Sequence, residues 1–328
     1  MAAALADQAT LFGVANIVEA RELRASGITH PIVLLGTCLP EEMEIAVREG
    51  WQVSISSLEE ATALNEIAKQ ISERAAAHVV LDTGMGRMGF LVHDWNAETI
   101  QSLKMLSHIE WEGLASHFPA ADGSDDDAAF TCGQIARFRE SVDMARVSGL
   151  QPRWIHLSNS AGMIGYHEAR GLCNLARPGL MLYGVSPMDG EWSNLRPALT
   201  WKTRVLLVRE LPADHGVSYG RSFTTKRPTW VATLACGYAD GYPRQLSGQG
   251  ADVLIHGLRC PILGRVTMDQ IMVDVTDLPL RAQVGDEAVL LGAQGAAAIT
   301  ATELAQKAGT IAWHIFTSIG ERVQRVHF

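Results

Sequence analysis

The sequence predicts an α/β protein: a TIM-type β/α barrel that lacks its first strand, followed by a mainly β C-terminal domain. Apolar strand segments alternate with helical segments between Leu11 and Gly184, and such alternation with continuously apolar strands indicates a parallel sheet. Seven strands can be counted there, whereas a barrel of this kind closes with eight. Beyond Pro197, short strands are separated by Gly, Pro and Asp, which is typical of a mainly β domain.

Capping signals and apolar runs place the elements of the first domain. Asn16 fits an N-cap, and Ser57 with Glu60 three residues later forms a capping box. The expected strands are 11–15, 32–36, 51–56, 78–84, 111–118, 154–159 and 175–184. The expected helices are 18–26, 40–50, 57–77, 96–109 and 130–149.

A boundary is expected between Pro187 and Pro197, which gives domains at 1–190 and 191–328. The second domain should contain one helical segment, 300–321, before a last strand at 322–328. The other strands expected there are 198–211, 229–239, 251–257, 259–266, 270–278 and 287–292.

Charge and hydropathy exclude several classes of partner. The net charge of −9 without a basic tract argues against nucleic acid. No apolar run reaches the roughly 20 residues of a membrane span, and the first residues lack the basic and apolar regions of a signal peptide. We therefore expect a cytoplasmic enzyme that acts on a small molecule.

Neither the cysteines nor the acidic residues form a recognisable metal site. The five cysteines are widely spaced and include no C-x-x-C, which indicates a reduced cytosolic chain without disulfides or zinc. The acidic cluster 122–127 lacks outer ligands at the spacing of a calcium loop, so we interpret it as a solvated surface loop. We expect no bound metal.

Polar side chains gather where the predicted strands of the first domain end. Since the active site of a β/α barrel lies at the C-terminal ends of its strands, these residues predict its position. They are Asp82, Thr83, Ser116, His117, Asn159 and Ser160.

The stretch 154–187 combines two features of a cofactor site. Small residues after a strand let backbone N–H groups approach an anion, and the Ser160 hydroxyl adds a donor. Arg177 lies in an otherwise apolar run one strand away. Together they suit a phosphorylated, planar cofactor, although two buried strands with an Arg–Asp pair explain the pattern equally well.

Seven motifs occur in an order that closely resembles the alanine racemases, which are fold-type III pyridoxal-phosphate enzymes. The resemblance runs from about Leu11 to the C-terminus, and it implies an eight-stranded barrel, a C-terminal β domain and a head-to-tail homodimer with shared active sites. The motifs are DTGMGRMG (82–89), SHF (116–118), HLSNSAG (156–162), RPGLMLYGVSP (177–187), VSYGRSF (217–223), ACGYADGYPR (235–244) and GRVTMDQIMVDVTD (264–277).

The resemblance implies that Arg177 faces the pyridine nitrogen of pyridoxal 5′-phosphate. An arginine there disfavours protonation of that nitrogen and weakens the ring as an electron sink, which favours racemisation over transamination. His156 would orient Arg177 through a hydrogen bond, although a hydrogen-bonded barrel histidine without such a role is the alternative. His117 would pack against the cofactor ring.

The phosphate and the substrate would be held by residues of both domains. The resemblance assigns the phosphate to Ser160 and the N–H groups of Gly179 and Leu180. The substrate-binding residues would be Arg87, Met268 and Tyr238, and the general base on one face of the substrate would be Tyr219, supplied by the partner subunit.

Three positions depart from the family pattern. Val80 stands where many members have a carbamylated lysine that steadies the arginine of DTGMGR. Trp313 stands where a tyrosine often binds the phosphate, and its indole N–H could donate instead. The family motif K-A-N-A-Y-G-H-G, which supplies the cofactor-binding lysine, has no counterpart, so we expect Met1 to be an internal methionine of a longer frame. The chain alone should then be slow or inactive.

Two classes of function remain open: an amino-acid racemase, which supplies D-alanine for peptidoglycan, and a non-catalytic or degenerate pyridoxal-phosphate protein. VSYGRSF and GRVTMDQ favour the racemase, because these motifs serve an active site shared across a dimer. Alanine cannot be distinguished from another amino-acid substrate such as serine.

Overall fold

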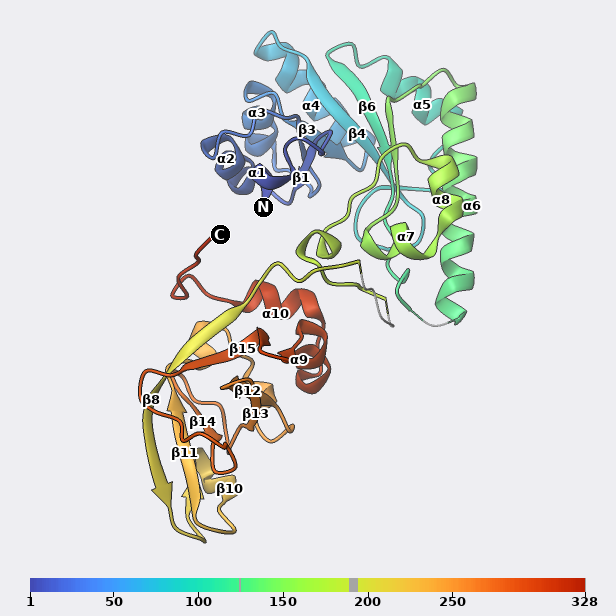
Figure 1. The fold of residues 1–328 in the computed structure, drawn as a ribbon. Coiled ribbons are helices and arrows are strands. Elements are labelled where there is room, and N and C mark those ends of the chain that lie inside the picture. The colour runs from blue at the N-terminus through green and yellow to red at the C-terminus, as the bar shows by residue number, and fades with distance from the viewer. Residues whose placement is uncertain (124, 189–193, 328) are drawn as a thin grey trace. The chain divides into compact units, whose positions relative to one another are not determined.

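The computed structural model describes residues 1–123, 125–188 and 194–327. The chain divides into two compact units, Met1–Gly179 (unit 1) and Leu180–Phe328 (unit 2) (Figure 1). Each unit has its own sheet and is described separately. None of the helices in the described ranges is long and apolar enough to cross a membrane.

Unit 1 is built on a curled parallel sheet. Every neighbouring pair of strands in it is parallel. The strand order is β1 (Phe12–Val14), β2 (Ile32–Leu34), β3 (Gln52–Ile55), β4 (Ala75–Asp82), β6 (Ile109–Ala115) and β7 (Trp154–His156), and the short β5 (Phe90–Leu91) pairs with β4.

Helices connect these strands, and two of them begin at the N-caps that the sequence predicts. The Asn16 side chain accepts hydrogen bonds from the N–H groups of Val18 and Glu19, and Ser57 accepts from Glu60. Figure 1 shows the long α6 beside α8. The helices are α1 (Ala2–Leu5), α2 (Ile17–Ala25), α3 (Pro40–Arg48), α4 (Leu58–Gln70), α5 (Ala97–Lys104), α6 (Asp125–Val147), α7 (Ser160–Gly165) and α8 (His167–Leu172).

The predicted strand 175–184 is wrong. Only Leu175 makes a parallel bridge, to His156, and the chain then forms the 3₁₀ helix η1 (Leu180–Tyr183). Pro178 explains the interruption, because proline has no N–H for a strand ladder. The short helices α1, α7 and α8 were not predicted.

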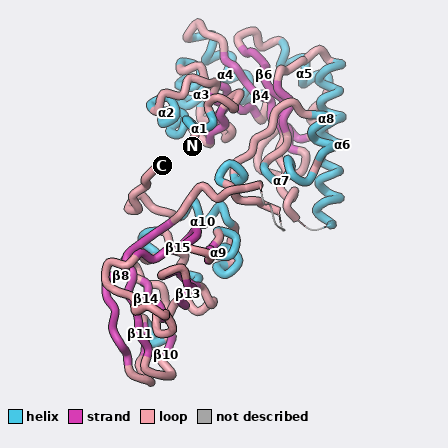
Figure 2. Tube along the Cα trace, in the orientation of Figure 1, coloured by secondary structure: helices cyan, strands magenta, loops and turns pink. Residues whose placement is uncertain are grey.

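Unit 2 is an antiparallel sheet with two helices (Figure 2). Its strand order is β13 (Leu258–Pro261), β12 (Asp252–Ile255), β15 (Glu287–Gln294), β8 (Trp201–Leu211), β11 (Thr229–Leu234) and β14 (Ile271–Asp274), with β16 (Ala297–Ile299) on β15. A separate hairpin joins β9 (Gly216–Val217) to β10 (Phe223–Thr224). Together, the parallel sheet and this antiparallel unit confirm the predicted fold class.

Two predictions for unit 2 need correction. The helical segment 300–321 is split into α9 (Ala301–Ala308) and α10 (Ala312–Ser318), because Gly309 adopts a left-handed conformation that ends α9. Residues 322–327 form no strand, and residue 328 lies outside the described residues. Three short 3₁₀ helices connect strands: η2 (Tyr219–Arg221), η3 (Tyr238–Asp240) and η4 (Arg244–Leu246).

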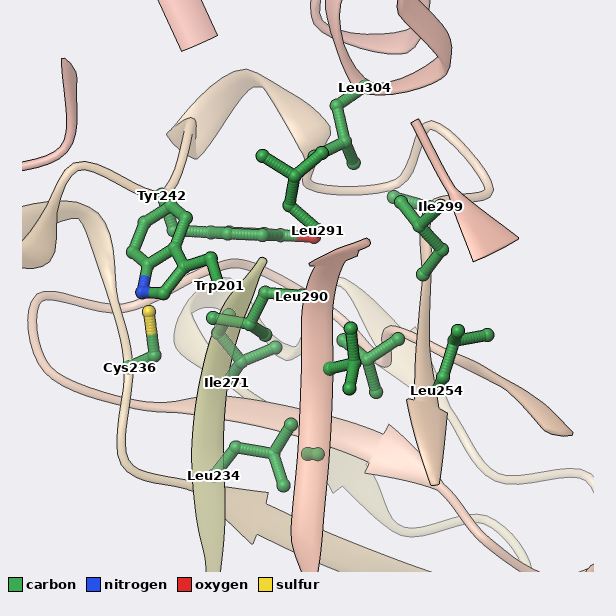
Figure 3. Close-up of a cluster of buried hydrophobic side chains, with 14 of the residues drawn as sticks. Trp201, Leu234, Cys236, Tyr242, Leu254, Ile271, Leu290, Leu291, Ile299 and Leu304 are labelled. Atoms are coloured by element: carbon green, nitrogen blue, oxygen red, sulfur yellow. The ribbon is translucent and has the colours of Figure 1, made fainter. Parts of the chain in front are cut away.

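The core of unit 2 lies between its sheet and α9 (Figure 3). Trp201 and Tyr242 meet edge to face, with ring centroids 5.9 Å apart. Aliphatic side chains from the central strand β15 and from α9 complete this core, among them Leu290, Leu291 and Leu304. Burial of these large apolar side chains is the main source of stability for such a unit.

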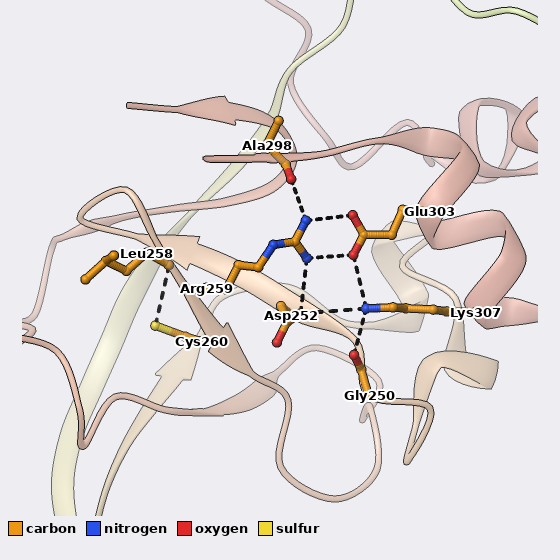
Figure 4. A network of polar contacts seen from close by, with 8 residues as sticks. All are labelled: Gly250, Asp252, Leu258, Arg259, Cys260, Ala298, Glu303 and Lys307. Atoms are coloured by element: carbon orange, nitrogen blue, oxygen red, sulfur yellow. Dashed lines mark hydrogen bonds and ion pairs between the residues drawn. The ribbon is translucent and has the colours of Figure 1, made fainter. Parts of the chain in front are cut away.

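An ion-pair network ties α9 to the edge of the sheet (Figure 4). Arg259 on β13 makes two hydrogen bonds to the Glu303 carboxylate, at 2.6 and 2.8 Å. Lys307 bonds Glu303 at 3.0 Å, and Asp252 pairs with both Arg259 and Lys307. Hydrogen bonds mainly from Arg259, and also from Lys307, lower the pKa of Glu303 to about 2.

Candidate functional site

A cavity of about 500 Å³ lies in unit 1 at the C-terminal ends of its strands. Residues that end or follow four of these strands line it, namely Val14, Leu35, Asp82 and Ala115. The walls also include Arg87, His117, His156 and Arg177. The cavity therefore gathers four of the residues that the sequence predicts for the site.

Arg177 is held by the ends of two strands. Its Nη2 donates to the backbone oxygen of Ser116 at 2.6 Å and to His117 Nδ1 at 3.3 Å, while Nη1 donates to His156 Nδ1. Burial, and to a smaller extent the charge of Arg87, lower the pKa of Arg177 to about 10. Arg177 therefore stays a cation at neutral pH and can only donate hydrogen bonds.

The contact with His156 extends deeper into the barrel. His156 Nε2 lies 2.7 Å from His78 Nδ1, and His78 Nε2 lies 2.7 Å from Gln52 Oε1. Burial lowers the pKa of His78 to about 3 and that of His156 well below its usual value, and the positive charge of Arg177 adds to both effects. Both imidazoles are therefore neutral at physiological pH.

His117 lines the cavity beside Arg177 and is neutral as well. Burial is the main cause that lowers its pKa to about 4, and the charges of Arg177 and Arg87 lower it further. The Nδ1 atom that accepts from Arg177 leaves the rest of the ring available to the cavity.

The DTGMGR segment forms a turn that two sets of hydrogen bonds hold. The Asp82 carboxylate accepts hydrogen bonds from the N–H groups of Gly84, Met85 and Gly86 at 2.8 to 2.9 Å. Arg137 of α6 donates two hydrogen bonds to the backbone oxygen of Thr83, at 3.1 and 2.8 Å.

Arg87, which follows this turn, lines the cavity without a hydrogen bond to any residue that the structure describes. Val80 lines the same wall and has no polar group with which to steady it. The fastened backbone of the turn, rather than a partner of the guanidinium, thus positions Arg87.

Two of the residues predicted to bind phosphate, Ser160 and Gly179, lie together in unit 1. Gly179 donates its N–H to Ser160 Oγ at 3.0 Å, and the Asn159 side chain caps α7 by accepting from Gly162 N–H. A Cβ on Gly179 would meet no atom within 4 Å, so space remains beside this residue. Leu180 begins unit 2 and is buried.

Three of the predicted site residues of unit 2, Tyr219, Tyr238 and Met268, have exposed side chains. Tyr219 is 69% exposed and Met268 is 52% exposed. Their loops are joined, because Ser218 Oγ donates to the backbone oxygen of Arg265 at 2.7 Å. The N–H of Ala239, next to Tyr238, donates to the backbone oxygen of Met268 at 2.9 Å. Unit 2 thus brings Tyr219, Tyr238 and Met268 into one loop cluster.

Tyr219 is held in an unusual backbone setting. Its neighbours Ser218 and Arg221 have positive φ values of 64° and 46°, although neither is glycine. Such conformations cost of order 1–3 kcal/mol and cluster at functional sites. The last predicted residue, Trp313, lies on α10 with its side chain partly exposed.

Two family models match consecutive parts of the chain. The N-terminal domain of alanine racemase matches residues 1–187, and the C-terminal domain of alanine racemase matches residues 198–327. The chain belongs to the alanine racemase family.

Individual relatives agree with this assignment. The alanine racemase of Symbiobacterium thermophilum is 42% identical over 99% of this chain and 85% of that relative. The solved structure of alanine racemase from Streptomyces coelicolor A3(2) has a TM-score of 0.88 at 35% identity and covers 99% of this chain and 86% of that chain. Alanine racemase from Bacillus anthracis, with bound L-Ala-P, has a TM-score of 0.84 at 34% identity, over 96% of this chain and 80% of that chain.

Sequence reasoning missed several residues that support the walls of this cavity. Arg137 and Gln134 lie inside a helix that looks ordinary in sequence, yet Gln134 donates to Thr83 Oγ1 and to the backbone oxygen of His117. His78 and Gln52 stand in apolar strands. A buried histidine within such a run was the one available signal, because a buried imidazole needs hydrogen-bond partners.

Proposed function

We propose that this chain carries the alanine racemase activity of its family, with pyridoxal 5′-phosphate bound in the cavity of unit 1. The observation that carries this proposal is the setting of Arg177. Its Nη atoms are bound by Ser116, His117 and His156, whereas no acceptor for its Nε–H occurs among the residues of the described ranges. A cavity-lining donor of this kind fits an unprotonated ring nitrogen.

The other donors also fit such a cofactor. Gly179 lies beside open space and is hydrogen-bonded to Ser160; together with the Leu180 N–H and the Trp313 indole N–H, these two residues would hold the phosphate. His117 would lie against the ring. The bound cofactor would supply an electron sink for the charge left when the substrate loses its α-proton, and Arg177 would keep that sink weak enough for the proton to return.

Inversion at the α-carbon requires a proton to leave one face and another to arrive on the opposite face. We assign one of these transfers to the Tyr219 hydroxyl. The substrate carboxylate would be bound by Arg87 and by the Met268 N–H, and Tyr238 would line the entrance. Exposure of Tyr219 and Met268 on unit 2 supports a homodimer in which these residues complete the partner's site.

We assign the second proton transfer to a lysine of the kind that the family motif K-A-N-A-Y-G-H-G supplies. None of the described residues that line the cavity is a lysine, and the chain has only five: Lys69, Lys104, Lys202, Lys226 and Lys307. Loss of one general base typically slows a reaction 10²–10⁴-fold. These 328 residues alone should therefore racemise alanine far more slowly than a version that supplies a lysine to the cavity.

The test compares the 328-residue chain with a version extended before Met1 by a strand that carries K-A-N-A-Y-G-H-G, called here the lysine-complete version. With added pyridoxal phosphate, D-alanine should form from L-alanine at least about 100-fold faster in that version. Borohydride reduction and peptide mapping should find the cofactor on the added lysine. Equal rates, or trapping on one of the five native lysines, would contradict the proposal.

Further readouts separate this function from its alternatives. A preference for serine over alanine would assign another racemase, and cofactor binding without racemisation in the lysine-complete version would assign a non-catalytic binder. Location in the cytoplasm and supply of D-alanine for peptidoglycan are proposed from the family membership alone.

A further inference from the structure

Four side chains from separate parts of the barrel form one hydrogen-bonded chain in unit 1. Gln52 on β3, His78 on β4 and His156 on β7 lead to Arg177 at the cavity. The distance from His156 Nε2 to His78 Nδ1 and the distance from His78 Nε2 to Gln52 Oε1 are both 2.7 Å. The three residues behind Arg177 are buried, and His78 is 0% exposed. We call this set the Gln52–Arg177 chain.

The backbone of β6 leaves space for the side chains of the Gln52–Arg177 chain. His78 and His156 lie on the two strands that flank β6, so their rings meet across it. Gly113 of β6 lies at the crossing point, where a Cβ would approach His78 Nδ1 to 2.1 Å. A side chain at this position would therefore separate the two histidines, and the contact depends on a glycine there.

Only one arrangement of protons satisfies every contact. Since a guanidinium can only donate, His156 must accept at Nδ1 and, being neutral, carry its proton on Nε2. That proton points to His78 Nδ1, which must also accept, so His78 carries its proton on Nε2 and donates to Gln52 Oε1. Any other tautomer, or a charged imidazole, would set two donors or two acceptors against each other.

Gln52, at the far end of the Gln52–Arg177 chain, therefore influences whether His156 presents a lone pair or an N–H to Arg177. An amide oxygen at Gln52 favours the Nε2–H form of His78, which in turn favours the Nε2–H form of His156 and leaves its Nδ1 lone pair toward Arg177. If this acceptor were removed, His156 could adopt the Nδ1–H form, which would oppose the donor of Arg177. Burial lowers the pKa of His78 and of His156, so both imidazoles stay uncharged near pH 7, as this pattern of hydrogen bonds requires.

We propose that Gln52 and His78 are positioning residues, which lock the tautomer of His156 and thereby hold Arg177 in its orientation at the cavity. The step from this orientation to catalysis rests on the proposed function, in which Arg177 faces the cofactor ring. Control of the His156 tautomer by Gln52 and His78, called here the tautomer lock or simply the lock, does not require the cofactor, so it can be measured in the cofactor-free protein.

The first measurement is nitrogen NMR of the histidine side chains in the cofactor-free 328-residue chain, with assignment by single His→Gln variants. His78 and His156 should both be neutral Nε2–H tautomers throughout pH 5 to 8. Detection of Nδ1–H on His156, or of a charged ring in that range, would overturn the proposal.

Two substitutions test the direction of the effect. Gln52→Met keeps the volume but removes the acceptor, so the ratio of Nε2–H to Nδ1–H forms at His156 should fall roughly fivefold to tenfold, as expected for one lost hydrogen bond. Gln52→Glu keeps an acceptor and should retain the Nε2–H form of His156 above the pH at which His78 becomes charged. An unchanged His156 in Gln52→Met would overturn the lock.

A matched control separates the lock from a general loss of stability. Asn65 is a buried amide on α4 that accepts from His108 N–H, outside the cavity. Asn65→Leu should destabilise unit 1 while leaving the His156 tautomer unchanged. In the lysine-complete version, Gln52→Met should lower kcat more than it raises KM.

Failure of the lock and failure of the proposed function are distinguishable. If the tautomers behave as expected but Arg177 substitutions leave racemisation unchanged, the proposed role of Arg177 is wrong and the lock stands. If Arg177 is essential but the tautomers do not respond to Gln52→Met, the lock is wrong and the function stands.

Discussion

The two units carry their predicted site residues in opposite settings. In unit 1, Arg177 is hydrogen-bonded to His117 and to His156, and His156 is buried. In unit 2, Tyr219 and Met268 are exposed on loops whose backbone is strained and cross-linked. This contrast fits the proposed dimer, in which unit 1 would preorganise one half of each site and the exposed residues of unit 2 would complete the site of the partner.

The largest effect should follow from replacing Arg177, which makes hydrogen bonds to several residues around the cavity of unit 1. Arg177→Glu removes the donor to the Ser116 oxygen, and its carboxylate would favour protonation of the cofactor ring nitrogen that the proposed function places beside Arg177. In the lysine-complete version, racemisation should fall by at least about 100-fold. Racemisation and transamination are measured together, with Arg177→Lys as the conservative control, and an unchanged racemisation rate would remove Arg177 from the ring nitrogen.

Substitution of the exposed Tyr219 should slow removal of the α-proton mainly from one enantiomer of alanine. Tyr219→Phe in the lysine-complete version should slow α-proton exchange from L-alanine by about 10²–10⁴-fold and that from D-alanine far less. Because the side chain is 69% exposed, the free energy of unfolding should stay unchanged. Equal slowing of exchange from both enantiomers would refute the assignment of Tyr219 to one face.

The turn that carries Arg87 should depend on α6. Arg137→Met removes two hydrogen bonds to the Thr83 oxygen, so unit 1 should lose about 1.5–3 kcal/mol of stability. Amide hydrogen exchange should quicken at residues 84–87, and KM for alanine should rise more than kcat falls. Arg146→Met, which removes an exposed ion pair at the end of the same helix, is the control and should change neither quantity. Unaltered exchange at 84–87 would show that Asp82 alone fastens the turn.

The smallest effect is expected in the ion-pair network of unit 2. The pKa of Glu303 is lowered to about 2 in the folded chain, against 4.5 ordinarily. Its stabilisation is therefore complete above about pH 4.5 and is lost as the pH falls toward 2.

Glu303→Gln should cost unit 2 about 1 kcal/mol at neutral pH and flatten the loss of stability on acidification. Denaturant unfolding at several pH values measures both. Glu44→Gln, which breaks an exposed pair with Arg48, should have no comparable effect. An equal pH dependence in Glu303→Gln and the parent chain would contradict the assigned pKa.

The sequence predicted the parallel sheet, the second β unit and the caps at Asn16 and Ser57, because each depends on neighbouring residues or a short period. It failed at 175–184, where apolar composition suggested a strand but Pro178 removed the necessary N–H. His78 and Gln52 were missed for another reason. Their roles depend on the register of strands distant in sequence and on the absence of a side chain at Gly113.

The contrast between the two units leads to one direct test. If a site combines unit 1 of one subunit with unit 2 of its partner, a mixed dimer of Arg177→Glu and Tyr219→Phe chains contains one site with neither substitution. Each variant of the lysine-complete version is prepared alone, and the two are then mixed in equal amounts under conditions that exchange subunits.

On mixing, the nearly inactive variants should regain about one quarter of the parent racemisation rate, because half of the dimers are mixed and each has one of two sites intact. Recovery should follow the formation of mixed dimers, detected by mass spectrometry. Complete formation of mixed dimers without any recovery of D-alanine production would contradict the claim that the exposed residues of unit 2 complete the partner's preorganised site.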